Sequence, residues 1–263
     1  MCEVIVITSG KGGVGKSTLT ANIGAALAAR NQRITLIDLD IGLRNLDVIL
    51  GLEQRLTYNL IDVIRGRCRL KQALIRDERF PNLRILPSSQ QDQTVDLDLD
   101  RFREVLTELR GENDYILLDC PAGIERGFQN AIAYADRCIL AVTPDIASLR
   151  DATKVIHVCD RMHYNRIELL VNKLIPELVL SGDMIDISDI TQIMNLPLLG
   201  VVPMSRSMIL TYNQGIPVIQ DDCTARKCMM NIAARIMGDE IPIPGVRSMT
   251  SWLSILSWKY AKT

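Results

Sequence analysis

A glycine-rich loop near the N-terminus decides the fold class. The stretch reads VIVITSGKGGVGKSTL over residues 4–19, and residues 10–17 satisfy the pattern G-x-x-x-x-G-K-[ST]. The loop follows a Val/Ile run of strand length and precedes a helical segment, which is the context of a phosphate-binding loop. Its glycines let backbone N–H groups turn toward phosphate oxygens, and the following helix adds partial positive charge. The sequence therefore predicts a nucleotide site in which Lys16 reaches the terminal phosphates and Ser17 binds Mg²⁺.

Short apolar runs alternate with longer helical segments along most of the chain. This alternation predicts an α/β fold: a single P-loop NTPase domain with a mainly parallel, twisted sheet and helices on both faces. We expect the domain to span residues 1–240 and a C-terminal tail to follow over 241–263, because residues 241–245 read Ile-Pro-Ile-Pro-Gly. The expected strands are 4–8, 34–38, 83–86, 115–119, 137–142, 168–171 and 198–202, and the expected helices include 17–30, 97–110, 146–161, 183–194 and 224–237.

Carboxylates follow two of the expected strands. Open α/β sheets bind their ligands at the carboxyl ends of the strands, so these side chains belong near the loop. Asp119 comes after four apolar residues, as a Walker B carboxylate does, and would hold the hydration shell of Mg²⁺. Asp38 and Asp40 are either ordinary strand-end charges or part of the site. The phosphate loop favours the site, where a nearby carboxylate can position or deprotonate the attacking water.

The bulk composition excludes several other classes of protein. Acidic and basic side chains nearly cancel, 31 against 30, which disfavours a DNA-coating protein but not a local basic patch. Seven cysteines without a C-x-x-C pair indicate free thiols in a reducing compartment. His157 and His163 are spaced to point to different faces of a helix, which makes them poor metal partners. We expect no secretion signal and no membrane-spanning segment, because no apolar run is long enough.

The residue after the first glycine of the loop indicates one family of phosphate-loop proteins. Lys11 directly follows the first glycine, and this loop resembles the deviant Walker A motif of the MinD/ParA family of ATPases. The resemblance implies that Lys11 reaches across a dimer interface to the phosphates bound by the partner. A cation delivered by a second subunit would stabilise charge on the phosphoryl group only in the dimer.

Other segments resemble the MinD branch of that family. Residues 38–47 are similar to its switch I, residues 119–125 to its switch II, and the likeness extends over residues 3–238. It implies that ATP and Mg²⁺ are the cofactors and that Asp40 positions the hydrolytic water. The implied catalytic residues are Lys11, Lys16 and Asp40; the implied nucleotide-binding residues are Gly10, Lys11, Gly12, Gly13, Val14, Gly15, Lys16, Ser17, Thr18 and, at the adenine, Asn172; the implied metal-binding residues are Ser17, Asp38 and Asp119.

The C-terminal tail departs from the family, whose members usually end in a basic amphipathic helix that binds anionic lipid. Residues 249–263 are amphipathic but carry few charges, Lys259 and Lys262 with Arg247 upstream. The tail is either a membrane anchor, which we favour, or a segment that packs on its own domain or on a partner. The residues sharing one helical face are Met249, Trp252, Leu253, Ile255, Leu256 and Tyr260.

The resemblance implies a spatial regulator of the division site in a cell or a plastid. Such a protein hydrolyses ATP, forms a homodimer with ATP and attaches to the membrane until hydrolysis releases it. The implied partners are a MinC-like division inhibitor and a MinE-like activator, with no nucleic acid. The expected location is the cytoplasm and the inner face of the cell membrane, or the stroma and inner envelope of a plastid that encodes the gene.

Two alternatives remain open from the sequence. One is a ParA-like DNA-partition ATPase, which would bind DNA through basic residues. The other is an electron-transfer ATPase resembling the nitrogenase iron protein, in which cysteines of two subunits hold an iron–sulfur cluster. Cys120 lies within the switch II segment, next to Asp119, and this position argues against it as a cluster ligand.

Overall fold

One sheet organises the residues that the computed structural model describes, 2–90 and 97–246. Its strands are β1 (Glu3–Thr8), β2 (Ile34–Asp38), β3 (Ile75–Arg76), β4 (Leu83–Leu86), β5 (Tyr115–Asp119), β6 (Arg137–Val142), β7 (Ile167–Leu174) and β8 (Leu198–Pro203). The eight strands are ordered β3-β4-β2-β5-β1-β6-β7-β8, and all neighbours are parallel except β3 and β4. The predicted fold class is therefore confirmed.

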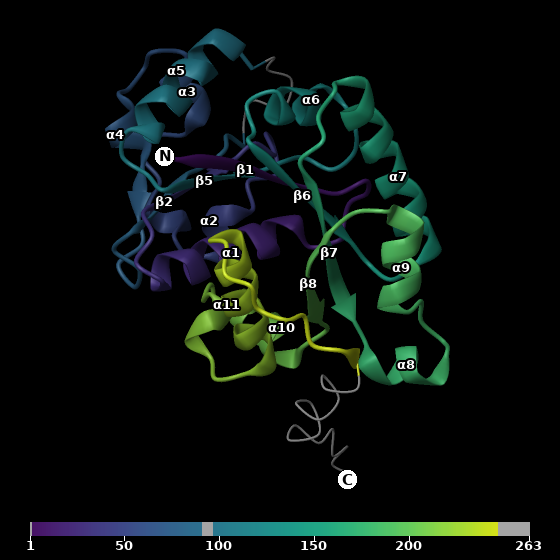
Figure 1. The fold of residues 1–263 in the computed structure, drawn as a ribbon. Helices are drawn as coiled ribbons and strands as arrows, with labels where there is room; N and C mark the ends of the chain where they lie inside the picture. The colour runs from purple at the N-terminus through teal and green to yellow at the C-terminus, as the bar shows by residue number, and fades with distance from the viewer. Residues whose placement is uncertain (1, 91–96, 247–263) are drawn as a thin grey trace.

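Helices cover both faces of this sheet (Figure 1). They are α1 (Lys16–Ala29), α2 (Leu46–Ile49), η1 (Glu53–Arg55), α3 (Leu60–Ile64), α4 (Leu70–Ala73), α5 (Leu99–Arg110), α6 (Arg126–Ile132), α7 (Ile146–Arg161), α8 (Pro176–Ser181), α9 (Ile187–Met194), α10 (Arg206–Asn213), η2 (Val218–Gln220) and α11 (Thr224–Ile236). Alternate residues of β1 enter two separate cores: Val4 and Val6 pack with α5, α6, α7 and α9, while Ile5 and Ile7 pack with α1, α2 and α11. This three-layer arrangement explains why the strands are apolar throughout.

Several predicted elements agree with the structure, and others differ in their bounds or were missed. Strands β2, β4, β5 and β6 have the expected bounds. Helix α9 begins at Ile187 rather than at 183, because the Asp186 carboxylate accepts a hydrogen bond from the Ser188 N–H at 2.8 Å and caps the helix there. Strand β3, which has only two residues and runs antiparallel at the sheet edge, was not predicted.

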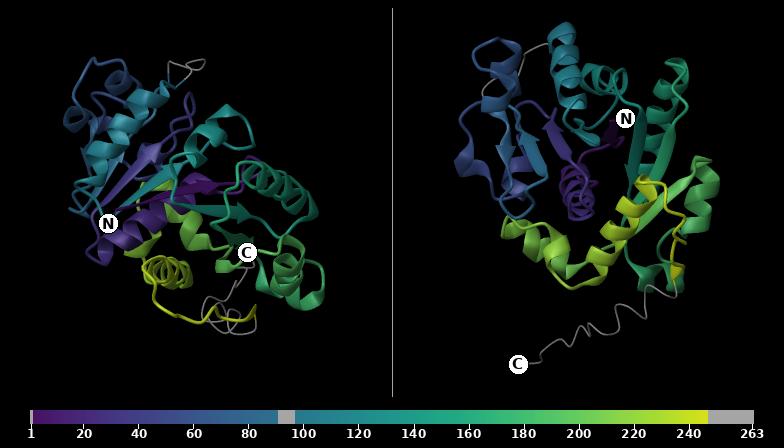
Figure 2. Two further views of the ribbon diagram at one scale, coloured as in Figure 1. Left: turned by 45° about the horizontal axis from the view of Figure 1, so that its top comes forward. Right: turned by 60° about the vertical axis from the view of Figure 1, so that its left-hand side comes forward.

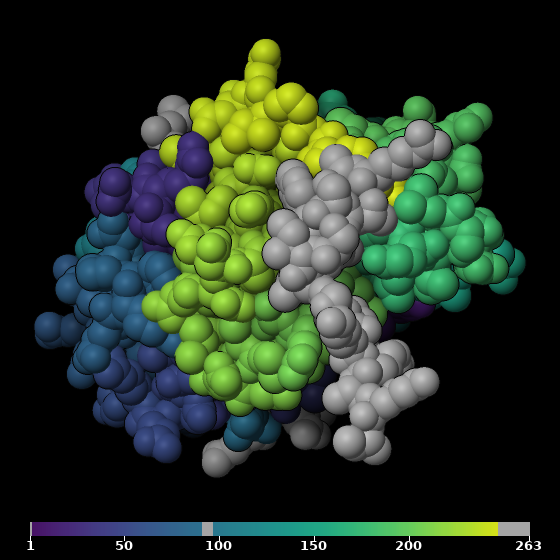
Figure 3. Space-filling model, turned by 90° about the horizontal axis from the view of Figure 1, so that it is seen from below, coloured from purple at the N-terminus to yellow at the C-terminus, as the bar shows by residue number. Residues whose placement is uncertain are grey.

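Two glycines meet back to back on the underside of the domain. A Cβ on Gly215 would lie 2.6 Å from the Cα of Gly51, and both residues have left-handed backbones, with φ of 64° and 62°. The Arg79 guanidinium joins the two turns by donating to the carbonyl oxygens of Leu50 and Gly215, and it forms an ion pair with buried Asp77 at 2.7 Å. These contacts fasten the end of α2 to the turn after α10, and the blue and yellow-green segments touch in Figure 3.

The chain remains in contact with the domain for several residues after α11. Arg235 donates hydrogen bonds to the carbonyl oxygens of Ile241 at 2.8 Å and Pro242 at 2.9 Å, and Ile243 and Val246 pack against the core. The described chain ends beside α8 in Figures 1 and 2. The expected anchor at 249–263 lies outside the described residues.

Candidate nucleotide site

The phosphate loop connects β1 to α1 as the sequence predicts, and its glycines are needed for different reasons. Gly13 and Gly15 have left-handed backbones, with φ of 78° and 98°, which glycine adopts without steric cost. Gly10 is needed because α7 passes so closely that a Cβ there would lie 2.2 Å from the carbonyl carbon of Asp151. The remaining members of the motif, Gly12, Val14, Ser17 and Thr18, complete the loop and the first turn of α1.

Lys16 begins α1 and is almost completely buried, with 7% of its surface exposed. Burial raises the pKa of both Asp40 and Asp119, and the nearby positive charge of Lys16 offsets part of that rise. A lysine at a helix N-terminus, with free N–H groups around it, provides a binding site for phosphate oxygens.

Two buried carboxylates lie side by side beyond the loop. Asp38 and Asp119 end the neighbouring strands β2 and β5, and they are direct register partners with no exposed surface. Burial raises the pKa of Asp38 to about 7. Burial, followed by the negative charge of Asp38, raises the pKa of Asp119 to about 8. Two like charges held together without water require a proton or a cation.

The donor set around this pair fits Mg²⁺. Asp119 Oδ2 is buried and accepts no hydrogen bond, and the Ser17 hydroxyl lies close enough to lower the pKa of Asp119. Carboxylate and hydroxyl oxygens are the ligands that Mg²⁺ prefers, and it keeps waters and phosphate oxygens as further ligands. Residues 2–90 and 97–246 contain no cluster of three or more His, Cys, Asp or Glu side chains able to hold a metal.

Asp38 has a further task that the sequence pattern did not indicate. Its Oδ1 accepts a hydrogen bond from the Asp40 N–H at 2.9 Å, and its Oδ2 accepts one from the Asn45 N–H at 3.0 Å and one from the Leu46 N–H at 3.3 Å. The carboxylate therefore closes the loop that carries Asp40 and holds the start of α2. Asp40 itself is only partly buried, and burial raises its pKa.

Lys11 lies at the outer side of the phosphate loop. Its Nζ forms an ion pair with Asp145 Oδ1 at 2.9 Å, directly after β6. The same carboxylate accepts hydrogen bonds from the Thr143 hydroxyl and from the Ser148 N–H at 2.8 Å. The hollow in front of this ion pair has a volume of about 310 Å³ and is lined by Lys11, Gly12, Gly13, Thr143, Pro144, Asp145, Lys173 and Met184.

Asn172 is positioned behind the loop. The residue is 5% exposed, and its Nδ2 donates to the carbonyl oxygen of Val14 at 2.8 Å. The structure thus places Asn172 at the nucleotide site, and its predicted contact with adenine stays a prediction. Cys120 is fully buried, and all seven cysteines are free thiols.

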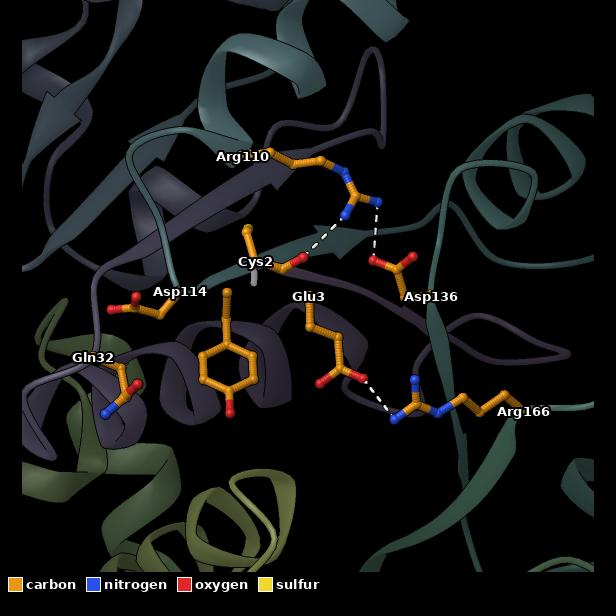
Figure 4. Close-up of a pocket in the computed structure, with 8 residues that line it drawn as sticks. Cys2, Glu3, Gln32, Arg110, Asp114, Asp136 and Arg166 are labelled. Atoms are coloured by element: carbon orange, nitrogen blue, oxygen red, sulfur yellow. Dashed lines mark hydrogen bonds and ion pairs between the residues drawn. The ribbon is translucent and has the colours of Figure 1, made fainter.

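A larger hollow lies at the opposite, amino-terminal edge of the sheet (Figure 4). Its volume is about 500 Å³, but its charges are paired among themselves: Arg110 with Asp136 at 2.9 Å, and Arg166 with Glu3 at 2.9 Å. Ligands of open α/β sheets bind at the other edge. The phosphate-loop edge is therefore the candidate site.

Comparison with known proteins agrees with this geometry. A family profile described as an AAA domain matches residues 2–172. The septum site-determining protein MinD of Synechocystis is 43% identical over 244 residues, which cover 92% of this chain and 92% of that protein. The chain belongs to the MinD family. In the MinC:MinD cell division protein complex of Aquifex aeolicus, a 42% identical chain superposes with a TM-score of 0.86, over 92% of this chain and 98% of that one.

MinD membership confirms the predicted enzyme class and cofactors. A septum site-determining MinD from Pyrococcus horikoshii was solved as a complex with Mg-ADP and is 28% identical to this chain. It superposes with a TM-score of 0.80, and the match covers 92% of this chain and 100% of that one. This MinD-family chain is an ATP hydrolase that uses ATP and Mg²⁺.

Proposed function

We propose that this protein is a spatial regulator of division-site placement that is switched by ATP. The observation that carries the proposal is the place of Lys11 in a chain of this family. Within one subunit the lysine is bound to Asp145 at 2.9 Å, and 33% of its side chain remains exposed. A lysine in that place can act on a second nucleotide when another subunit covers the loop.

The site residues would divide the work of hydrolysis. Lys16 and the N–H groups of the loop hold the phosphates, and Asp40 positions the attacking water or accepts its proton. Ser17, Asp38 and Asp119 would hold Mg²⁺, which neutralises charge on the phosphate oxygens when bound. Lys11 of a second subunit adds the charge that the subunit alone lacks, so dimerisation controls the rate.

Exposed apolar side chains at the same edge support a homodimer. Leu43, in the loop after β2, is 66% exposed, and Ile146, at the start of α7, is 72% exposed. Large apolar side chains near a polar site are typical of surfaces that a partner covers. A second copy of the chain would bury both residues while bringing its own Lys11 to the phosphates.

We further propose that the tail at 249–263 attaches the dimer to a membrane. No helix among residues 2–90 and 97–246 is long and apolar enough to cross a membrane. A single amphipathic segment binds lipid only marginally, but two on one dimer act together and can strengthen attachment by about 10² to 10⁴. Attachment would then follow dimerisation and end with hydrolysis.

The proposed partners follow from the family. The Aquifex neighbour is part of a MinC:MinD complex, which supports a MinC-like inhibitor as partner of this chain. A MinE-like activator would stimulate hydrolysis. The proposed place is the cytoplasm and the inner face of the cell membrane, or the stroma and inner envelope of a plastid.

Liposome co-sedimentation with ATP, with ADP and without nucleotide tests the proposal. We expect the full chain to sediment with vesicles only in ATP, and a variant lacking 249–263 to stay in solution while it still binds ATP. If the truncated chain sediments equally well, the tail is not the anchor. Retention on DNA in ATP that salt abolishes, without binding to vesicles, would instead indicate the ParA-like function.

A further inference from the structure

Two consecutive residues of β7 contact the same loop from behind. Asn172 Nδ2 donates to the carbonyl oxygen of Val14 at 2.8 Å, and Lys173 Nζ donates to the carbonyl oxygen of Gly13 at 2.7 Å. Successive side chains of a regular strand point to opposite faces of the sheet. A regular strand could therefore supply only one of these two contacts.

An irregularity in β7 makes both contacts possible. Asn172 pairs with Val202 and Leu174 pairs with Pro203, so Lys173 is an extra residue without a partner in this register. Its φ of 59° is left-handed, which is unfavourable for a residue with a Cβ. Bulges of this kind redirect side chains and occur next to active sites, and strain that persists in a fold indicates a role there.

The two hydrogen bonds set the direction of the loop's N–H groups. A trans peptide is planar, so each carbonyl points away from the N–H of the next residue. Holding the carbonyls of Gly13 and Val14 toward β7 directs the N–H groups of Val14 and Gly15 to the opposite side. We propose that Asn172 and Lys173 are positioning residues, which hold the phosphate loop so that these N–H groups face the phosphates.

The close fit between Asn172 and the loop explains one glycine of the motif. A Cβ on Gly15 would lie 2.7 Å from Asn172 Nδ2, nearer than such atoms can approach. Gly15 is therefore required both for its left-handed backbone and for the space that the amide takes. Lys173 also lines the hollow at the Lys11–Asp145 ion pair, so its ammonium adds positive charge there.

Asn172 and Lys173 would act on nucleotide binding in this way whatever process the ATPase serves. This role differs from the adenine contact predicted for Asn172, because a residue that orients the loop acts on the phosphates and not on the base. The two roles have different consequences for the choice between ATP and GTP.

Lys173→Met tests the lysine, and the exposed Lys71, which pairs with Glu112 at 3.5 Å far from the loop, gives the control Lys71→Met. We expect Lys173→Met to bind Mg-ADP roughly tenfold more weakly in titration calorimetry, because a charge-assisted hydrogen bond is lost. The KM for ATP should rise similarly while kcat changes less than about twofold, since the loop holds the phosphates in the ground and transition states alike. Lys173→Arg should restore most of the affinity. Equal affinity in Lys173→Met and Lys71→Met would overturn the proposal.

Asn172→Asp tests the amide, because a carboxylate cannot donate to the Val14 carbonyl. We expect ATP and GTP to lose affinity by the same factor, so that the preference between them is unchanged. A changed preference would assign Asn172 to the base and overturn its positioning role. Circular dichroism shows whether this buried variant folds, and the exposed Lys173→Met decides the proposal independently of it.

Discussion

The two edges of the sheet differ in how their charges are satisfied. At the amino-terminal edge the hollow is larger, about 500 Å³, but Arg110, Arg166 and their carboxylates are paired with each other. At the carboxyl-terminal edge the hollow is about 310 Å³, yet Asp119 Oδ2 is buried without a hydrogen bond beside Asp38. The nucleotide edge is therefore distinguished from the opposite edge by a buried carboxylate that lacks a partner, and not by the size of its hollow.

The largest effect should come from Asp40→Ala. Removal of a group that positions or deprotonates water lowers kcat for ATP hydrolysis by about 10² to 10⁴, while Mg-ATP binding changes little because the contact matters chiefly in the transition state. Phosphate release and sedimentation mass in ATP measure both consequences, and we expect the variant to accumulate as a dimer. At the opposite edge, Asp114→Asn should hydrolyse ATP at the wild-type rate. A similar loss of ATP hydrolysis in both variants would contradict the assignment of the site to the carboxyl-terminal edge of the sheet.

Lys16→Ala should weaken Mg-ATP binding about a hundredfold, because it removes a buried charge-assisted contact to the phosphates. Equilibrium titration with a fluorescent ATP analogue measures the change. Arg110→Gln removes a cation from the larger hollow and should leave nucleotide affinity unchanged. Unaltered affinity in Lys16→Ala would exclude the phosphate-loop assignment.

The carboxylate pair predicts a pH dependence of the nucleotide-free protein. The folded state raises the pKa of Asp38 to about 7 and of Asp119 to about 8, whereas an unfolded Asp titrates near 3.9. The stability that the protonated pair contributes is complete below pH ~4 and is lost as pH rises through 7 and 8. Between pH ~6 and ~8.5 the free energy of unfolding should fall by about 4 kcal/mol.

Thermal unfolding in EDTA across that pH range measures this loss. Mg-ADP should reduce the slope, because a bound cation takes the place of the protons, and Asp119→Asn should reduce it too. If the melting temperature of the nucleotide-free protein rises with pH over this interval, Asp38 and Asp119 do not have the raised pKa values.

The smallest effect concerns the ion pair between Lys11 and Asp145. Asp145→Asn frees the lysine but keeps an acceptor for the Ser148 N–H at the start of α7. If Lys11 crosses to the partner's phosphates as proposed, each subunit of a dimer gives up one such pair, and pairs this exposed are worth about 0.5 kcal/mol each. The concentration for half-dimerisation in ATP should therefore fall about fivefold, as sedimentation would show. A higher concentration would mean that Asp145 itself contributes to the dimer.

The features that the sequence predicts best are those that residues close together in the chain determine. The phosphate loop is a contiguous motif, and β2 and β5 are apolar runs that each end in an aspartate, so their bounds and their place at one edge followed from the pattern. The contact of Asn172 with Val14 joins residues 158 positions apart, and the bulge at Lys173 depends on the register with β8. No local pattern signals either feature.

Two further features of the structure have local signals in the sequence. Asp186 precedes the apolar residues of α9 and is a common N-cap residue, which would have placed the helix start correctly. The role of Asp38 in closing its own loop is also local, since its partners Asp40, Asn45 and Leu46 follow within eight residues. Short polar side chains often accept N–H groups of the residues that follow them.

The paired glycines on the underside give the site a mechanical connection to a distant surface. Helix α2 starts where Asp38 holds the backbone and ends at the turn that Arg79 and Gly215 fasten to α10. Neither glycine leaves room for a side chain, so the two turns are in direct backbone contact. Ile209 and Tyr212 of α10 are exposed, at 52% and 41%. The backbone that Asp38 holds and the exposed side of α10 are therefore joined through a single tight contact between two backbone turns.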